Sequence, residues 1–328
     1  MSGVKCINKN RLRLSASVLL SLSFILTGCQ GQIKQEYSLD SRAAEYGFVK
    51  EDSSSLMASD LCPYIEDSSG ADQNKTVYAA GAFNETTGET KYSQNLLKKI
   101  YPASTTKILT ALVAIENGNL NQICTVEASD LDLPAGSSVA HLRVGDRLSL
   151  YDLMKGMLLE SGNDAAKAIA RSVAGSEEKF ADLMNQKARK IGASHSHFVN
   201  PDGLPDEDHY TCAYDMYVIF HNALKEKTFR TIIRSKKQKA TVTDSTGKAS
   251  IVTYKSTNLY FTGDIRSPEG IRVLGGKTGT TNDAGYCLVL WSENKTTKAK
   301  IITVVFKADT RYDLYLMTNK LLTSFGSV

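Results

Sequence analysis

The sequence predicts an α+β fold in which one antiparallel sheet, built from both ends of the chain, carries helices on its faces and surrounds a helical middle. The first observation is that β-rich runs occur at residues 76–92 and 273–307, with helical periodicity between them. The second is the composition: 42% hydrophobic, 23% charged and six Pro in 328 residues is ordinary for a globular protein. Disordered, collagen-like and multipass membrane architectures are therefore excluded.

The first elements form a hairpin followed by a helix. Residues 76–83 and 89–92 have strand character and flank a turn at Thr86–Gly88. Pro102 then precedes an amphipathic helix that ends at Asn117–Gly118. Further helices are expected at 149–159, 163–173, 176–190, 212–225 and 311–324.

The C-terminal half is rich in strands. Residues 239–243 and 250–254 flank Asp244–Gly247, which predicts a second hairpin. Three more strands are expected at 273–279, 285–291 and 300–307. No internal repeat is present, so the fold is not a solenoid.

The N-terminus predicts export from the cytoplasm. Four basic residues within the first 13 precede the apolar run Leu14–Leu26 and then Thr27-Gly28-Cys29. This is the order of a secretory signal, and the run is shorter than the ~20 residues that span a bilayer. Leu26–Cys29 resembles the lipobox of bacterial lipoproteins, which implies cleavage before Cys29 and acyl chains on that residue. An ordinary signal peptide or signal anchor is the alternative.

These features divide the chain into residues 1–28 as a lipoprotein signal peptide, 29–75 as a tether and 76–328 as the folded domain. The domain is then extracytoplasmic and anchored to the cell membrane through lipid on Cys29. The four basic residues of the signal account for the formal charge of +4. Because the remainder has no net charge, nucleic-acid binding is not expected.

The remaining cysteines do not predict a metal site. Cys62, Cys124, Cys212 and Cys287 are widely spaced, and their pairing stays open. His195, His197 and His209 fall in one segment, but an i, i+2 pair with one distant His is not a zinc spacing. The sequence therefore predicts no metal and no cofactor.

Three short motifs follow one another in an informative order. Ser104-Thr105-Thr106-Lys107 is an SxxK that opens a helix, Ser161-Gly162-Asn163 is an SxN, and Lys277-Thr278-Gly279 is a KTG on a strand. SxxK and SxN each recur elsewhere in this chain, whereas KTG is unique. The ordered set is the one found in penicillin-interacting serine enzymes.

Ser104 and Lys107 predict a nucleophile and its base. The first turn of a helix has free N–H groups and a positive dipole end, which favour developing negative charge. Lys107, three residues later, lies on the same helical face and can accept the hydroxyl proton. It must be neutral to do so, and burial together with a second cation, Lys277, would lower its pKa. The alternative is a capping Ser104 and a solvated Lys107.

The other motifs complete a catalytic cleft. Ser161 and Asn163 fall between two helices, where Ser161 can relay a proton and Asn163 can hold Lys107 or the substrate amide; simple capping is the alternative. The glycines beside Lys277 admit close approach of another backbone, so a peptide can add along this strand. Lys277 and the threonine hydroxyls of this strand would meet a substrate carboxylate, and the Thr280 N–H together with that of Ser104 would form an oxyanion hole. The predicted substrate-binding residues are Lys277, Thr278, Gly279 and Thr280.

From about Thr76 onward the chain resembles the serine-type D-Ala-D-Ala carboxypeptidases, the low-molecular-mass penicillin-binding proteins. The matching blocks are Tyr101–Lys107, Ser161–Ala166, Phe198–Leu204, Gly276–Gly279 and Ala284–Tyr286. The resemblance implies a penicillin-binding or serine β-lactamase-like fold and a D,D-carboxypeptidase that acts in the cell wall. Ser104 would be acylated by a peptidoglycan stem peptide ending in D-Ala-D-Ala and would release the terminal D-Ala. β-Lactams would acylate the same serine as inhibitors.

The chain departs from the family at one position. Some members place an Arg against the substrate carboxylate on the segment after the last strand. That position aligns with Leu314 in this sequence, and Arg311 lies three residues earlier. The resemblance therefore does not assign the residue that binds the carboxylate beyond the KTG strand.

Two alternative functions are less well supported. A class A β-lactamase carries a Glu-x-x-Leu-Asn stretch after SxN, and the sequence has none. A non-catalytic penicillin-recognising binding or sensor module would need a transmembrane partner, and all three catalytic motifs are present here. The carboxypeptidase is the predicted function.

Overall fold

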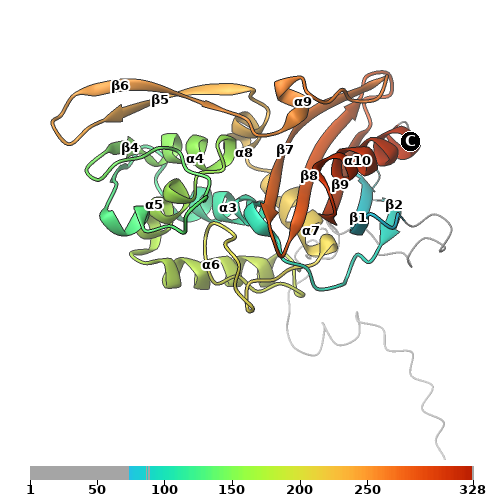
Figure 1. The fold of residues 1–328 in the computed structure, drawn as a ribbon, viewed down its shortest axis with the longest axis horizontal. Helices are drawn as coiled ribbons and strands as arrows, with labels where there is room; N and C mark the ends of the chain where they lie inside the picture. Colours follow the sequence, from blue (N-terminus) through green and yellow to red (C-terminus); the bar gives the residue numbers. More distant parts are fainter. Residues whose placement is uncertain (1–73, 86, 88, 327–328) are drawn as a thin grey trace, which may run out of the picture. The chain divides into compact units, whose positions relative to one another are not determined.

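The computed structural model describes residues 74–326 except 86 and 88 (Figure 1). The predicted signal peptide, nearly all of the predicted tether, the lipidation site Cys29 and Cys62 lie outside the described residues. Two of the three residues of the first predicted turn, Thr86 and Gly88, do so as well. The division into signal, tether and domain therefore stays a prediction.

The central sheet joins the two ends of the folded part, as predicted. It contains β1 (Val77–Asn84), β2 (Glu89–Gln94), β7 (Ile271–Thr281), β8 (Gly285–Asn294) and β9 (Lys300–Ala308) in the order β2-β1-β9-β8-β7. All neighbours are antiparallel, and Gly81 of β1 pairs with Val304 of β9. The KTG strand β7 is at one edge of this sheet, so one of its sides is free to line a cleft.

Helices cover both faces of the sheet (Figure 1). On one face α10 (Arg311–Phe325) packs Leu314, Met317 and Leu321 against buried side chains of β1, β8 and β9. On the other face α7 (Ala213–Ala223) contacts β1 and β9 and joins the larger core of the helical region. The other helices of that region are α3 (Lys107–Asn117), α4 (Leu150–Leu159), α5 (Asn163–Ala174) and α6 (Glu177–Lys190). The predicted α+β fold is confirmed.

The predicted second hairpin, β5 (Lys237–Thr243) and β6 (Ala249–Lys255), is part of a separate sheet of order β3-β4-β5-β6. The short elements around it were not predicted. Its other strands have only three residues each, which is too few for a sequence period. The remaining elements are β3 (Ile123–Thr125), β4 (Arg147–Ser149), α8 (Lys227–Ile233), α9 (Leu259–Thr262), and the 3₁₀ turns η3 (Ala103–Thr106) and η4 (Ala128–Leu131).

Three cysteines lie in the described part of the chain. Cys124, Cys212 and Cys287 are free, buried thiols. No helix among residues 74–326 combines the length and the apolar character needed to cross a bilayer.

Candidate active site

Ser104 lies in the 3₁₀ turn η3, directly before α3 begins at Lys107. The turn is shaped by backbone that side chains rarely adopt, since Ala103 has a φ of 48°. Gly203, with a φ of 87°, packs against it, and a Cβ there would overlap the Ala103 carbonyl oxygen. Strain of this kind is common at functional sites, where the surrounding packing maintains it. Ser104 is half-buried at the floor of a cleft.

Lys107 points at Ser104 from a fully buried position. Its Nζ lies 3.0 Å from Ser104 Oγ, 2.7 Å from Asn163 Oδ1 and 2.6 Å from the Asp202 carbonyl oxygen. An ammonium has three donors, and these three oxygens accept all of them. A neutral amine would keep the bonds to Asn163 and Asp202 and turn its lone pair toward the serine hydroxyl. The geometry therefore serves both protonation states.

The environment of Lys107 makes the neutral state accessible. Burial lowers its pKa from 10.5 to about 8, and the Asp202 and Asp164 carboxylates limit the fall. The predicted lowering by burial is thus supported. A second cation is not needed to explain it.

The SxN motif occupies the break between α4 and α5, as predicted. Ser161 is held at a φ of 62°, and Asn163 begins α5 while its side chain reaches Lys107. Of the two roles predicted for Asn163, the structure shows the contact with Lys107. Next to it, the Asp164 carboxylate accepts the N–H groups of Ala140 and Leu142 and anchors the loop that borders the cleft.

Lys277 faces Ser161 from the opposite wall. Its Nζ donates to Ser161 Oγ and to the Thr278 carbonyl oxygen, each at 2.8 Å. Burial, and then the charge of Lys107, place its pKa well below the ordinary value. Repulsion between two cations is reciprocal, so a charged Lys277 would also lower the pKa of Lys107, and that expectation stays a prediction.

Gly279 allows strand β7 to approach the nucleophile. A Cβ at this position would lie 3.0 Å from the backbone nitrogens of Ser104 and Thr105, so no larger residue fits without displacement. The following residue, Thr280, lines the same cleft as Ser104. This arrangement is what the predicted oxyanion hole requires. The Thr278 hydroxyl is 2.8 Å from that of Thr257.

The cleft extends to both sides of Ser104. One hollow of about 390 Å³ runs along β7 to α10 and is bordered by Tyr286, Arg311 and Leu314. A second hollow, of about 460 Å³, lies toward Asp202 and the loop around Ser138. Sequence reasoning missed the Asp202 carbonyl, because a main-chain acceptor has no side-chain signature. Its only signal was the block Phe198–Leu204, which resembles the family.

A serine that hydrogen-bonds to a buried lysine, faced by an SxN turn and a KTG edge strand on an α+β fold, defines the class of penicillin-interacting serine peptidases. More particularly, the chain belongs to the D-alanyl-D-alanine carboxypeptidase family, peptidase S11, which matches residues 70–310.

Relatives and solved structures agree with this assignment. The chain is 32% identical over 244 residues to the D-alanyl-D-alanine carboxypeptidase DacF of Bacillus subtilis, covering 72% of this chain and 58% of the relative. It is 34% identical over 227 residues to a D-alanyl-D-alanine carboxypeptidase of Streptomyces sp., covering 65% and 76%. The crystal structure of a Streptomyces DD-transpeptidase superposes with a TM-score of 0.71 at 27% identity, covering 80% of this chain and all of that one. The chain thus spans about three fifths of the length of the first relative.

Proposed function

We propose that this protein is a D,D-carboxypeptidase that removes the terminal D-Ala from peptidoglycan stem peptides through an acyl-enzyme on Ser104. The observation that carries the proposal is the 3.0 Å contact between Lys107 Nζ and Ser104 Oγ, made by a lysine whose pKa burial lowers to about 8. Ser104 also lines the cleft, so a substrate carbonyl can reach the hydroxyl that this lysine contacts.

Acylation begins with neutral Lys107. Its lone pair takes the proton of Ser104, whose Oγ attacks the carbonyl carbon of the penultimate D-Ala. The N–H groups of Ser104 and Thr280 stabilise the oxyanion of the tetrahedral intermediate. The C–N bond then breaks, and the proton that Lys107 took from Ser104 passes through the Ser161 hydroxyl to the leaving amine, so that Lys107 is neutral again. Water, deprotonated by Lys107, hydrolyses the ester and restores Ser104.

The side of the cleft formed by β7 and the start of α10 (the strand wall) binds the C-terminus of the substrate. The peptide extends along the edge of β7, and its terminal carboxylate meets Lys277, Thr278 and Arg311. Arg311 and Leu314 both border the cleft, but only Arg311 carries a charge, and its guanidinium lies 5.9 Å from the Tyr286 ring centroid. Arg311, one helical turn before the aligned Leu314, therefore supplies the cation for the carboxylate.

β-Lactams are inhibitors in this proposal, because Ser104 attacks their strained amide in the same way and the acyl-enzyme is hydrolysed slowly. Transpeptidation is a second candidate activity, since the superposed Streptomyces enzyme is a DD-transpeptidase. In that case an amine, rather than water, would take the acyl group from Ser104.

The test is D-Ala release from diacetyl-Lys-D-Ala-D-Ala by the chain without residues 1–29, followed by benzylpenicillin labelling and intact mass. The chain offers a matched control: Ser176 begins another SxxK, where it only caps α6 by accepting the Lys179 N–H. Ser104→Ala should abolish both release and the adduct, and Ser176→Ala should retain both. A stable adduct with no release, even with glycine as amine acceptor, would indicate a binding module, and rapid penicillin hydrolysis a β-lactamase.

We also propose that the mature protein is held at the outer surface of the cell membrane by acyl chains on Cys29. The support is the signal-like order of charges, apolar run and Leu26-Thr27-Gly28-Cys29. Intact mass of the protein extracted from membranes should show loss of residues 1–28 and the added lipid. Cys29→Ser should lack both, and an unmodified wild-type Cys29 would contradict the proposal.

A further inference from the structure

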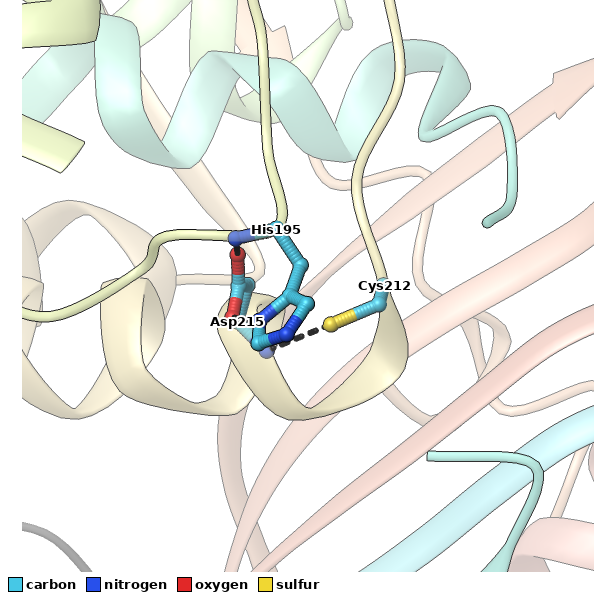
Figure 2. A group of neighbouring side chains, drawn as sticks. All are labelled: His195, Cys212 and Asp215. Carbon is cyan, nitrogen blue, oxygen red and sulfur yellow. Dashed lines mark hydrogen bonds and ion pairs between the residues drawn. The ribbon is translucent and has the colours of Figure 1, made fainter. Parts of the chain in front are cut away.

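A second group of reactive side chains lies outside the cleft. His195, Cys212 and Asp215 come together at the start of α7, and their ligand atoms are all within 4.8 Å of one another (Figure 2). The spacing of the histidines alone argued against a metal site. The fold instead combines one of them with a thiol and a carboxylate, which together offer a nitrogen, a sulfur and an oxygen.

The Asp215 carboxylate is only half satisfied. Its Oδ2 accepts the His195 N–H and the Ser196 hydroxyl, both at 2.7 Å. The other oxygen, Oδ1, is fully buried and has no hydrogen-bond partner. The His195 Nδ1 lies 3.6 Å from it, and the Cys212 side chain interacts with the same carboxylate. A buried carboxylate oxygen without a partner is energetically unfavourable, and a bound cation would correct this.

Cys212 holds the position of a helix cap. It is the N-cap of α7 and its Sγ accepts the Asp215 N–H at 3.4 Å. Ser, Thr, Asp and Asn are the preferred caps, because their oxygens accept this bond better than sulfur does. A cysteine here adds what an oxygen cap lacks, which is affinity for soft metal ions. The N–H bond to sulfur would also stabilise a thiolate ligand.

We propose that His195, Cys212 and Asp215 bind a zinc-class divalent ion. On binding, the Cys212 S–H bond breaks, its proton passes to solvent, and a sulfur–metal bond forms. Asp215 Oδ1 and a neutral His195 nitrogen supply the other protein ligands, and water takes the fourth position. Thiolate and imidazole select zinc-class ions over Mg²⁺ and Ca²⁺.

The geometry needs one adjustment. Tetrahedral zinc with bonds of about 2.0–2.3 Å brings its ligands closer together than the present 4.8 Å limit. The His195 side chain is 54% exposed, so it can rotate inward without disturbing the core, whereas Cys212 and Asp215 are fully buried. The same exposure gives the ion a path from solvent.

The site would fasten a loop that reaches the catalytic cleft. His195 and Cys212 lie at the two ends of this segment. Between them, the Pro201 carbonyl accepts the Thr110 hydroxyl at 2.6 Å, and the Asp202 carbonyl accepts Lys107 Nζ at 2.6 Å. A metal at the base of the loop would therefore stabilise the segment that positions the lysine.

The test is titration of the full chain in detergent with Co²⁺, which absorbs in the near-ultraviolet when bound to a thiolate, and measurement of tightly bound Zn²⁺. The expected result is one ion per chain, with thiolate absorption and a higher Tm with Zn²⁺. Cys212→Ser, which retains a cap, should abolish the absorption. His195→Gln should weaken Zn²⁺ binding at least about 10-fold, since loss of a ligand costs no less than loss of an outer-shell partner.

Matched controls are available in the same chain. Cys124→Ser alters another buried free thiol, and His197→Gln alters a neighbouring histidine whose Nδ1 bonds to the Asp208 carbonyl oxygen. Both should bind metal as the wild type does. Failure to bind one equivalent, or thiolate absorption that persists in Cys212→Ser, would overturn the proposal; with no metal bound, His195 and Asp215 form only an ion pair. None of these readouts depends on the catalytic activity.

Discussion

One side of the cleft is formed by the helices α3 and α5 (the helical wall) and the other is the strand wall. Each buries one lysine, and the two lysines differ in their surroundings. On the helical wall, Lys107 Nζ meets three oxygens and is influenced by the carboxylates of Asp202 and Asp164. On the strand wall, Lys277 Nζ meets two oxygens, and its pKa is lowered both by burial and by the charge of Lys107.

The two lysines are equally buried, so the difference between them lies in their hydrogen-bond acceptors and neighbouring charges. Three acceptors suit an ammonium, whereas two acceptors suit a neutral amine, which has two N–H donors. In the free enzyme Lys107 therefore carries the proton near neutral pH and loses it at about pH 8. The pKa of Lys277 is also lowered, first by burial and then by the charge of Lys107, and no carboxylate is among the causes of its shift. Two equally buried lysines therefore differ in the charges that act on them.

Replacing the lysine of the helical wall should have the largest effect. Lys107→Met keeps the length of the side chain but removes the base, so kcat/KM for D-Ala release should fall by about 10³-fold or more. Penicillin acylation should fall in parallel, measured by intact mass. Lys179→Met, in the exposed SxxK, is the matched control and should have wild-type rates. Retained acylation in Lys107→Met would show that another group is the base.

Replacing the lysine of the strand wall should lower the rate without moving its pH dependence. For the wild type, kcat/KM should rise about tenfold per pH unit and level off near pH 8, as Lys107 deprotonates. Lys277→Met should reduce kcat/KM about 10²-fold, through lost contacts with Ser161 and the substrate carboxylate. The pH at which kcat/KM levels off should stay near 8. If that pH rises in Lys277→Met, then Lys277 is charged in the free enzyme and repels the charge of Lys107.

A smaller effect is expected at the far end of the strand wall. Arg311→Gln should raise KM about 10-fold with little change in kcat, because a charged hydrogen bond to the terminal carboxylate is lost. A substrate whose terminal carboxylate is amidated should show no difference between the two enzymes. Leu314→Ala is the control for the aligned position. An unchanged KM in Arg311→Gln would return carboxylate recognition to Lys277 and Thr278 alone.

The smallest effect should come from a charge near the helical wall. Asp202→Asn keeps the Oδ1 that accepts the Leu204 N–H and the carbonyl that accepts Lys107. It removes a negative charge that raises the pKa of Lys107. The rise of kcat/KM with pH should therefore occur at lower pH, and activity at pH 6.5 should increase a few-fold. A rise at higher pH would contradict the assignment of this pH dependence to Lys107.

Local patterns in the sequence predicted most of the fold. The hairpin of β1 and β2, the helices α3 to α7 and α10, and strands β5 to β9 all have enough residues to show a period or a turn signal. β3 and β4 do not, and the sequence therefore missed them and the second sheet that they join. The SxxK, SxN and KTG motifs were found because each has a short, fixed spacing.

The tertiary structure alone decided the contacts between distant segments. It brought the Asp202 carbonyl to Lys107, placed Arg311 and Leu314 at the border of the cleft, and collected His195, Cys212 and Asp215 at one helix end. It also decided which burial and which neighbouring charges shift the pKa of each lysine. The physical reason is that secondary structure and motif spacing follow from neighbours along the chain, whereas burial, main-chain acceptors and the electrostatic field at a side chain depend on segments that only folding brings together.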